Sequence, residues 1–360
     1  MMSKMKKAFI TALVFIIVGI SGSIISGFYI MPQIVEEVYR VQREIRNATP
    51  TESEIFVTEE VVNTLDIEVL DQRGFDVEVK SSTDNKTRIT VYEYLDESIN
   101  VNADYHREDK RLIITGSRTI QHILNAENLK GFLERGYKAL IGTLMEESNN
   151  TNQIVIEVPT GVDINFKGNY NNNLIINESS VLKENLSYSC HNGYVDLPFN
   201  NNLKNIDIKT DSYLEMDIRE FINADKVNLE SAAISIVSAG YRNEYENITK
   251  LPESVTIYGN SVRVTSFMPL GKDVAISGNY VEYESNFEVY PINLQLRGRA
   301  GAESYYNNGM NNNFHGSKVS ENFQGIIGSE GTSENNLTIS RYYKCEIDNL
   351  SDFEIETEFK

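Results

Sequence analysis

The chain has 360 residues, enough for more than one domain, and its hydrophobic fraction of 41% excludes disorder throughout. It has no Trp and only 7 Pro but 20 Tyr and 15 Phe, a composition that suits β-strands with half-buried faces. The formal net charge of −19 repels phosphate backbones and anionic lipid headgroups, which argues against a nucleic-acid partner. The two cysteines, Cys190 and Cys345, make neither a disulfide framework nor a metal knuckle; they form one disulfide outside the cytoplasm or stay two free thiols.

The first 31 residues predict a membrane anchor. Residues 1–7 carry three lysines, and residues 8–31 are apolar apart from small and hydroxyl side chains. At about 1.5 Å per residue, such a helix just spans a hydrocarbon core of about 30 Å. A cleaved signal peptide is the alternative, but the apolar run continues past the small-residue stretch at 21–23. We therefore predict a cytoplasmic stub and transmembrane helix over 1–31, with the rest of the chain outside the cytoplasm.

Residues 32–50 predict a juxtamembrane helix and linker. Pro32 suits a first helical position, and Ile34, Val38, Val41 and Ile45 follow at spacings of four, three and four. This seam of under two heptads either packs on the chain's own domain or forms a short coiled coil in a weak homodimer.

Residues 51–118 alternate with period two, as in Phe75-x-Val77-x-Val79, and predict a sheet buried on one side. Residues 119–150 break this pattern with an apolar stripe at helical spacing, interrupted by three glycines. They predict a helical insertion that covers an end of the sheet or, alternatively, binds a partner.

Residues 151–360 predict a series of β-rungs. The segment 255–264 (VTIYGNSVRV) recurs nineteen residues later as 274–283 (VAISGNYVEY), with the Gly-Asn pair at the same place. Strands starting at residues 206, 227, 255, 274 and 292 are spaced as in solenoid repeats. Hairpins of a sandwich are the alternative. The resulting fold class is mainly β, a single-stranded β-solenoid or β-helix-like ectodomain with one helical insertion and an N-terminal transmembrane helix.

The sequence contains no motif for nucleophilic or nucleotide chemistry, and we expect no cofactor. Carboxylates recur at i and i+2, in the pairs Asp76/Glu78, Glu282/Glu284 and Glu346/Asp348. On a strand each pair shares one face, so stacked rungs would form an acidic ladder. This ladder is either a solvated face that blocks edge pairing, a Ca²⁺ or polysaccharide site, or a glycan-cleaving carboxylate pair.

Seven tyrosines in the predicted rungs either present aromatic faces to sugars or fill the core: Tyr170, Tyr188, Tyr194, Tyr213, Tyr258, Tyr280 and Tyr283.

Three segments carry a family resemblance: residues 75–82 (FDVEVKSS), 111–116 (RLIITG) and 154–161 (IVIEVPTG), which follow a lysine-led apolar segment. Together they resemble the β-strand-repeat "putative adhesin" domains, with the related head-GIN auto-transporter adhesins, of membrane-tethered proteins in low-GC Gram-positive bacteria. The resemblance covers roughly residues 60–350 and implies a single-pass envelope protein with a β-solenoid ectodomain. The insertion at 119–147 is atypical of this family, and no catalytic residue is implied.

Two functions follow as expectations. The first is a non-enzymatic, membrane-anchored surface or envelope protein that displays its rungs to a protein or an envelope polysaccharide. The second is a carbohydrate-active β-helix enzyme, or a Ca²⁺-dependent polysaccharide-binding module, that uses the stacked carboxylates.

Overall fold

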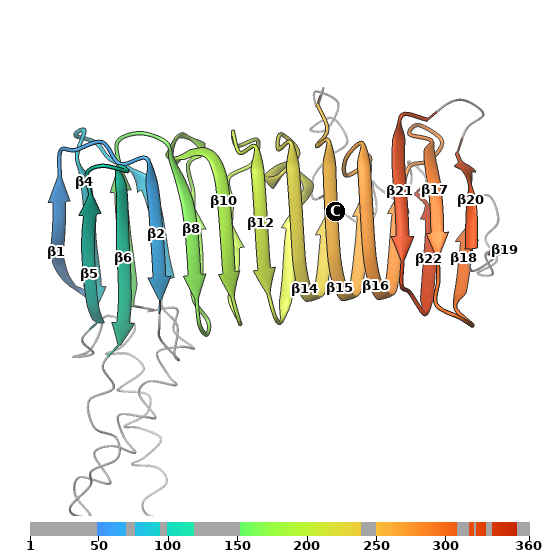
Figure 1. Ribbon diagram of the computed structural model, residues 1–360, viewed down its shortest axis with the longest axis horizontal. Coiled ribbons are helices and arrows are strands. Elements are labelled where there is room, and N and C mark those ends of the chain that lie inside the picture. Colours follow the sequence, from blue (N-terminus) through green and yellow to red (C-terminus); the bar gives the residue numbers. More distant parts are fainter. Residues whose placement is uncertain are drawn as a thin grey trace, which may run out of the picture. The chain divides into compact units, whose positions relative to one another are not determined.

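The computed structural model describes residues 49–69, 76–93, 99–118, 152–238, 250–307, 317–319, 322–328 and 333–350. The described strands belong to one compact unit and lie side by side (Figure 1). In chain order they are β1 (51–58), β2 (64–69), β3 (76–81), β4 (87–93), β5 (99–106), β6 (111–118), β7 (153–158), β8 (162–168), β9 (173–176), β10 (182–190), β11 (195–196), β12 (205–210), β13 (213–217), β14 (226–237), β15 (254–266), β16 (273–285), β17 (292–297), β18 (303–307), β19 (317–319), β20 (322–327), β21 (335–340) and β22 (344–349). Two three-residue 3-10 turns, η1 (179–181) and η2 (218–220), interrupt them.

The strands pair as rungs, each with a first strand, a turn and a second strand. First strands β2, β8, β10 and β12 and the leading part of β14 pair in parallel. Second strands β3, β9 and β11 pair in parallel on another sheet, and β13 pairs with the trailing part of β14. In β14, β15 and β16 both strands of a rung form one continuous strand through the turn. The predicted repeat is therefore present in register, with Val255 opposite Val274 and Val262 opposite Val281.

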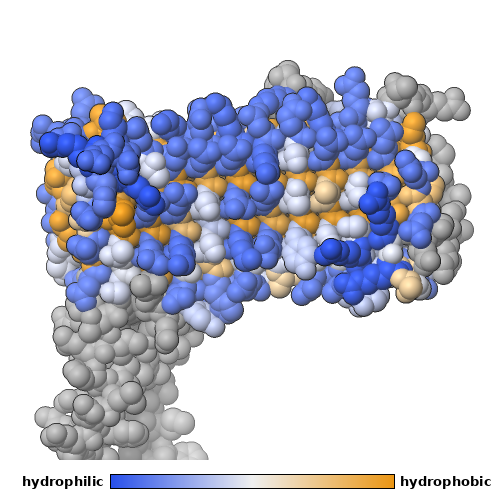
Figure 2. Space-filling view, viewed as in Figure 1, coloured by the Kyte–Doolittle hydropathy of each residue, from blue (hydrophilic) through white to orange (hydrophobic). Residues whose placement is uncertain are grey.

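Alternate side chains of each strand point inward and form the core. Strand β15, for example, buries Val255, Ile257, Val262 and Val264 to 1% exposure or less, and exposes Thr256, Tyr258 and Arg263. Figure 2 shows the result as alternating polar and apolar bands that run across the strands. Because a fully buried Val or Ile contributes about 1.5–3 kcal/mol, stacking such rows is the main stabilising term.

The rungs at both ends of the stack are out of chain order. Rung β2–β3 lies between rung β6–β7 and rung β8–β9. At the other end, rung β21–β22 lies between β16 and rung β17–β18. Antiparallel strands then cover each end rung: β4 and β5 cover β7 and β6, and β20 and β19 cover β17 and β18. Both ends thus use the same device to cover the last parallel edges.

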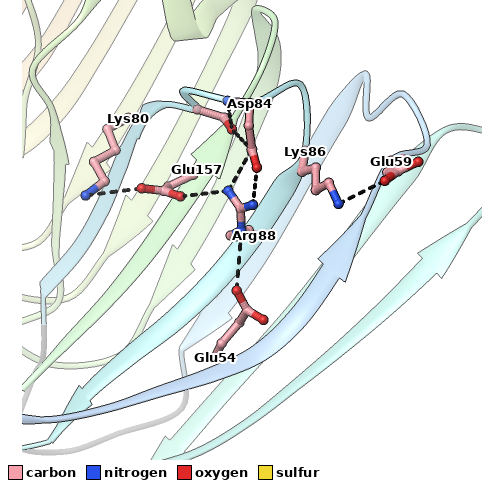
Figure 3. A network of polar contacts seen from close by, with 8 residues as sticks. Glu54, Glu59, Lys80, Asp84, Lys86, Arg88 and Glu157 are labelled. Atoms are coloured by element: carbon pink, nitrogen blue, oxygen red, sulfur yellow. Dashed lines mark hydrogen bonds and ion pairs between the residues drawn. The ribbon is translucent and has the colours of Figure 1, made fainter.

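A polar network ties strand β1 to the covering strands (Figure 3). Arg88 on β4 donates through Nη1 to Asp84 at 2.7 Å, and its Nε lies 3.4 Å from a carboxylate oxygen of Glu54 on β1. Glu157 on β7 lies 3.7 Å from Arg88 and 3.4 Å from Lys80 on β3. The hydrogen bond from Arg88 lowers the pKa of Asp84 to about 2. The network joins β1, β3, β4 and β7 in one place.

The predicted fold class requires a correction. The described residues are β structure with two short 3-10 turns and contain no α-helix, so the class with two helical parts is wrong for them. The physical reason is the period-two alternation of buried and exposed residues in strands such as β2, β12 and β15, which suits strands and not helices. No helix in the described part of the chain is long and apolar enough to cross a membrane. The predicted anchor (1–31), the predicted helical insertion (119–150) and all but the last two residues of the predicted juxtamembrane helix and linker (32–50) lie outside the described residues.

The order of the rungs also differs from the expected one. The strand at Ile292 does not follow β16 in space, because β21 and β22 pair with β16 instead. Strands that precede residues 119–150 in the chain and strands that follow them lie together in both sheets.

Candidate functional site

Exposed tyrosines gather along one edge of the rung stack. Every large, exposed tyrosine among the described residues lies at, or within two residues of, the turn between the first and the second strand of a rung. We call this surface the tyrosine edge; it consists of Tyr170, Tyr194, Tyr213, Tyr258, Tyr280 and Tyr343, which are 42–59% exposed. Of the seven tyrosines singled out in the sequence, five are on this edge, whereas Tyr188 and Tyr283 are in the core.

The first part of the tyrosine edge combines aromatic and charged groups. The ring of Tyr170 meets the ring of His191 edge-on, with 4.4 Å between centroids. His191 Nδ1 lies 2.6 Å from an oxygen of Asp211 on the next rung. The backbone N–H of Tyr194 donates to the side-chain oxygen of Asn173 at 3.1 Å. Partial burial and the nearby carboxylates raise the pKa of Tyr194, so its phenol stays a hydrogen-bond donor.

The middle of the edge is one row of four residues on four consecutive rungs. Tyr213 on β13 lies opposite Ala233 on β14, Ala233 opposite Ser261 on β15, and Ser261 opposite Tyr280 on β16. Two large aromatic side chains therefore flank two small ones. Beside this row, the amide of Asn279 donates to the side-chain oxygen of Asn260 at 3.3 Å. These four residues offer aromatic faces and small side chains without charge, and Lys344, which lies opposite Tyr280 on the next rung, is paired with Glu346.

The last part of the edge is fixed by an arginine. Tyr343 follows the turn before β22, and its N–H donates to the carbonyl oxygen of Asn279 at 2.8 Å. Arg299 donates through Nη1 to the Tyr343 hydroxyl at 2.7 Å, and its guanidinium carbon is 4.6 Å from the centre of the tyrosine ring. These contacts with Arg299 therefore restrain the side chain of Tyr343 more than that of Tyr280.

The edge where each rung begins is different in character, because its charges are paired. Lys250 lies 2.6 Å from Asp225, Lys272 lies 2.6 Å from Glu253, and Lys204 contacts Glu184. The hydrogen bond from Lys250 lowers the pKa of Asp225. Exposed pairs of this kind contribute little each to stability, but they leave these groups engaged with one another.

The acidic ladder expected from the sequence is present in part. The register places Glu282 opposite Glu346 and Glu284 opposite Asp348, so four carboxylates share the outer face of β16 and β22. Glu282 is 3.4 Å from Arg263, and Thr265 donates to Glu284 at 2.9 Å. Lys344 lies 2.6 Å from Glu346. In the part of the chain that the structure describes, no three His, Cys, Asp or Glu side chains are arranged to hold a metal ion.

The third predicted pair, Asp76 and Glu78, lies on β3 and is separate from the four carboxylates of β16 and β22. Asn173 donates to Asp76 at 2.7 Å, and Gln153 donates to Glu78 at 3.0 Å. Neutral amides from the two neighbouring rungs therefore satisfy this pair, and it forms cross-rung links within the scaffold.

The two cysteines do not meet. Cys190 ends β10 and Cys345 is on β22, with β12, β14, β15 and β16 between them in the sheet order. Both are buried free thiols, and burial raises the pKa of Cys345 to about 12.

One buried carboxyl was not found from the sequence. In the capping box of η2, the N–H of Asp217 donates to Glu220 at 3.3 Å, and the N–H of Arg219 donates to Asp217 at 2.8 Å. The second carboxyl oxygen of Glu220 is buried without a hydrogen-bond partner. Burial raises the pKa of Glu220 to about 8, so it is largely protonated at neutral pH. The signal in the sequence was the spacing Asp217-x-x-Glu220, which is that of a capping box.

No protein-family model and no curated protein matches the chain. Solved structures that it resembles include a "putative adhesin" from Parabacteroides merdae (12% identity, 84% of this chain and 97% of that chain, TM-score 0.39). Others are a similarly described adhesin from Bacteroides fragilis (10%, 83% and 97%, TM-score 0.28) and a "putative cell adhesion protein" from Clostridium sporogenes (10%, 83% and 99%, TM-score 0.22).

These descriptions agree with the adhesin part of the resemblance noted in the sequence. With identities and TM-scores this low, they carry no weight for the function of this chain. The relationship to head-GIN proteins and the tethering to a Gram-positive membrane stay predictions.

Proposed function

We propose that the chain is a non-enzymatic, adhesin-like protein of the cell surface or envelope, which binds an extended partner through the tyrosine edge. The observation that carries this proposal is the placement of six exposed tyrosines on one edge of the stack. A monomer without a partner gains nothing from such a concentration, whereas scattered exposed apolar residues are normal.

The contrast between edges supports the same assignment. Lysines and carboxylates on the edge where each rung begins engage one another, so that edge is satisfied within the chain. In the middle of the tyrosine edge the rings of Tyr213 and Tyr280 are exposed, and the amides of Asn260 and Asn279 bond to each other beside them. Tyrosine is enriched at binding surfaces because it supplies a large contact area with one polar tip.

The enzyme alternative lacks a comparable arrangement. Glu282 and Glu284 lie on the outer face of a strand, and each has a partner in Arg263 or Thr265. Arg263 is 55% exposed and Glu282 is 37% exposed, so the pair is open to solvent. The Asp76 and Glu78 pair is satisfied by amides.

Membrane anchorage is part of the proposal and rests on residues 8–31 of the sequence. Protease treatment of intact cells that express the full chain tests it: an anchored surface protein loses residues 49–350 to external protease. Full protection of this region in intact cells, with cleavage after lysis, would contradict a surface location.

The binding role is tested with the full-length chain in detergent micelles and with isolated cell envelopes. We expect the wild type to co-sediment with envelopes and the triple variant Tyr194→Ala, Tyr213→Ala, Tyr280→Ala to lose most of that binding. The matched control is Val61→Ala, Val289→Ala, Ile326→Ala, which removes exposed apolar side chains elsewhere. Equal envelope binding by the tyrosine variant and the control variant would overturn the proposal.

A further inference from the structure

We infer that the row from Tyr213 to Tyr280 is a seat for a short segment of a neutral polysaccharide. This inference rests on the proposed function and specifies the ligand class and the residues of the contact. The seat consists of Tyr213, Ala233, Ser261 and Tyr280, with Asn260 and Asn279 beside it.

The register sets the dimensions of the seat. Tyr213 and Tyr280 are in one row with two rungs between them. Neighbouring strands are about 4.8 Å apart, so the two tyrosines are separated by roughly 14 Å along the stack. Only Ala233 and Ser261 occupy the row between them. A stretch of two or three pyranose rings is of this length.

The two tyrosines at the ends of the seat are exposed to solvent. Tyr213 is 51% exposed and Tyr280 is 59% exposed. The hydroxyl of Tyr213 donates to Glu215, two residues along the same strand, at 3.1 Å, which holds its ring over the strand. The C–H face of a pyranose packs on such a ring, because both surfaces are apolar while their rims are polar.

Polar groups at the seat match the hydroxyl groups of a sugar. The Ser261 hydroxyl and the amides of Asn260 and Asn279 each donate and accept hydrogen bonds. The bond between the two amides, at 3.3 Å, aligns them across two rungs. An amide whose geometry is already fixed loses less conformational entropy when it binds.

Charge selects a neutral ligand over an anionic one. The four residues of the row carry no charge, and the chain's net charge of −19 repels anionic polymers. The closest charged position in register is Lys344 on β22, opposite Tyr280, and it lies 2.6 Å from Glu346. Arg263, two residues after Ser261, lies 3.4 Å from Glu282. Both cations are therefore already engaged by carboxylates of the chain, which weakens their attraction for a phosphate or a carboxylate of a ligand.

The experiment uses the full-length chain in detergent and tyrosine fluorescence, which is unmasked because the chain has no Trp. The probes are a soluble neutral β-glucan, a mannan and a chitooligosaccharide, together with a carboxymethylated form of the glucan. We expect saturable binding of at least one neutral probe and at least tenfold weaker binding of the carboxymethylated glucan. Lack of binding to all three neutral probes would overturn the inference.

Variants locate the seat. Tyr213→Ala and Tyr280→Ala each lower the affinity at least tenfold, and Ala233→Gln, which fills the row, does the same. Tyr280→Phe keeps the ring and binds within about threefold of wild type. Val289→Ala, which removes an exposed apolar side chain outside the tyrosine edge, is the control and changes affinity less than twofold. Circular dichroism melting verifies that each variant is folded.

The outcomes separate this inference from the proposed function. If the triple tyrosine variant loses envelope binding but the wild type binds none of the neutral probes, the proposed function stands and a polysaccharide seat is wrong. If the Tyr213 and Tyr280 variants bind the probes as tightly as the wild type does, the polysaccharide binds at another surface and the assignment of the seat is wrong.

Discussion

Gly278 lies directly against Gly259 of the neighbouring rung: a methyl group placed on Gly278 would be 2.7 Å from the carbonyl oxygen of Gly259. Likewise, a methyl group on Gly259 would be 2.9 Å from the carbonyl oxygen of Ser231 on the rung before it. The glycines of the repeated Gly-Asn pairs are therefore required by the close approach of successive turns. Their role is to let one rung rest on the next.

This contact makes Gly278→Ala destabilising. The added methyl group forces the backbone of two rungs apart, and overpacking of this kind costs about 1–3 kcal/mol. We expect a lower melting temperature in thermal denaturation followed by circular dichroism. Ser277→Ala, one residue earlier on the outer face, is the control and should melt close to wild type. A Gly278→Ala variant as stable as this control would show that the turns can separate without cost.

The alternation of β15 is tested by adjacent substitutions. Val262 is 1% exposed, so Val262→Asp buries an unpaired charge and costs several kcal/mol. Arg263 points outward, and its ion pair with Glu282 is exposed, so Arg263→Asp costs less than about 1 kcal/mol. Urea denaturation of both variants measures the difference. Equal losses of stability would contradict the inward and outward assignment of these two residues.

The buried Glu220 predicts a specific pH dependence. Its folded pKa of about 8 is above its usual value of 4.5, so between these pH values the unfolded chain releases a proton that the folded chain retains. Stability from this group is therefore full below pH 4.5 and is lost as the pH rises toward 8, with a slope of at most about 1.4 kcal/mol per pH unit. Denaturation at pH 5, 6, 7 and 8 measures the slope.

The Glu220→Gln variant provides the comparison for this slope. It keeps the shape of the side chain but cannot ionise, so we expect its stability to depend less on pH than that of wild type over this range. Parallel curves for the two proteins would assign the pH dependence to other groups.

The thiols should be unreactive in the folded protein. Cys345 is fully buried, and its pKa of about 12 keeps it protonated at pH 8, while the attacking species is the thiolate. Cys190 is 4% exposed. We expect a colorimetric thiol reagent at pH 8 to titrate two thiols in denaturant and to react with neither at a comparable rate in buffer. Fewer than two thiols in denaturant without reductant would indicate a disulfide.

The interior of the fold was predictable from sequence because its rungs are local and repeat. Residues 255–264 and 274–283 are neighbours in the chain and in the stack, so their shared pattern states their pairing directly. The pattern of small turn residues and inward-pointing Val and Ile side chains can be recognised within one rung, without knowledge of contacts that are distant in sequence.

The ends of the stack were not predictable in the same way. Leu337 pairs with Val274, and Leu65 pairs with both Leu112 and Ile164, across long stretches of chain. Hydrophobic alternation is the same whether a strand pairs with its neighbour in sequence or with a later one, so it cannot state the order. The antiparallel covering strands depend on the same missing information.

The tyrosine edge was visible in the sequence only as a collection of residues. Tyr213 and Tyr280 are 67 positions apart, and their common row depends on the register of four rungs. The same composition placed Tyr188 and Tyr283 in the core, because one step along a strand reverses the direction of a side chain.

The out-of-order end rungs also bear on how the protein sustains force. If the chain is held at its N-terminus and pulled by a bound partner, tension first reaches β1, whose one partner among the described strands is β4. The next strand, β2, is bonded on both sides, to β6 and to β8, so it can leave only when two parallel ladders shear together. Peeling therefore meets its main resistance at the second strand, and the partner's load is spread over the rungs instead of unravelling them one at a time.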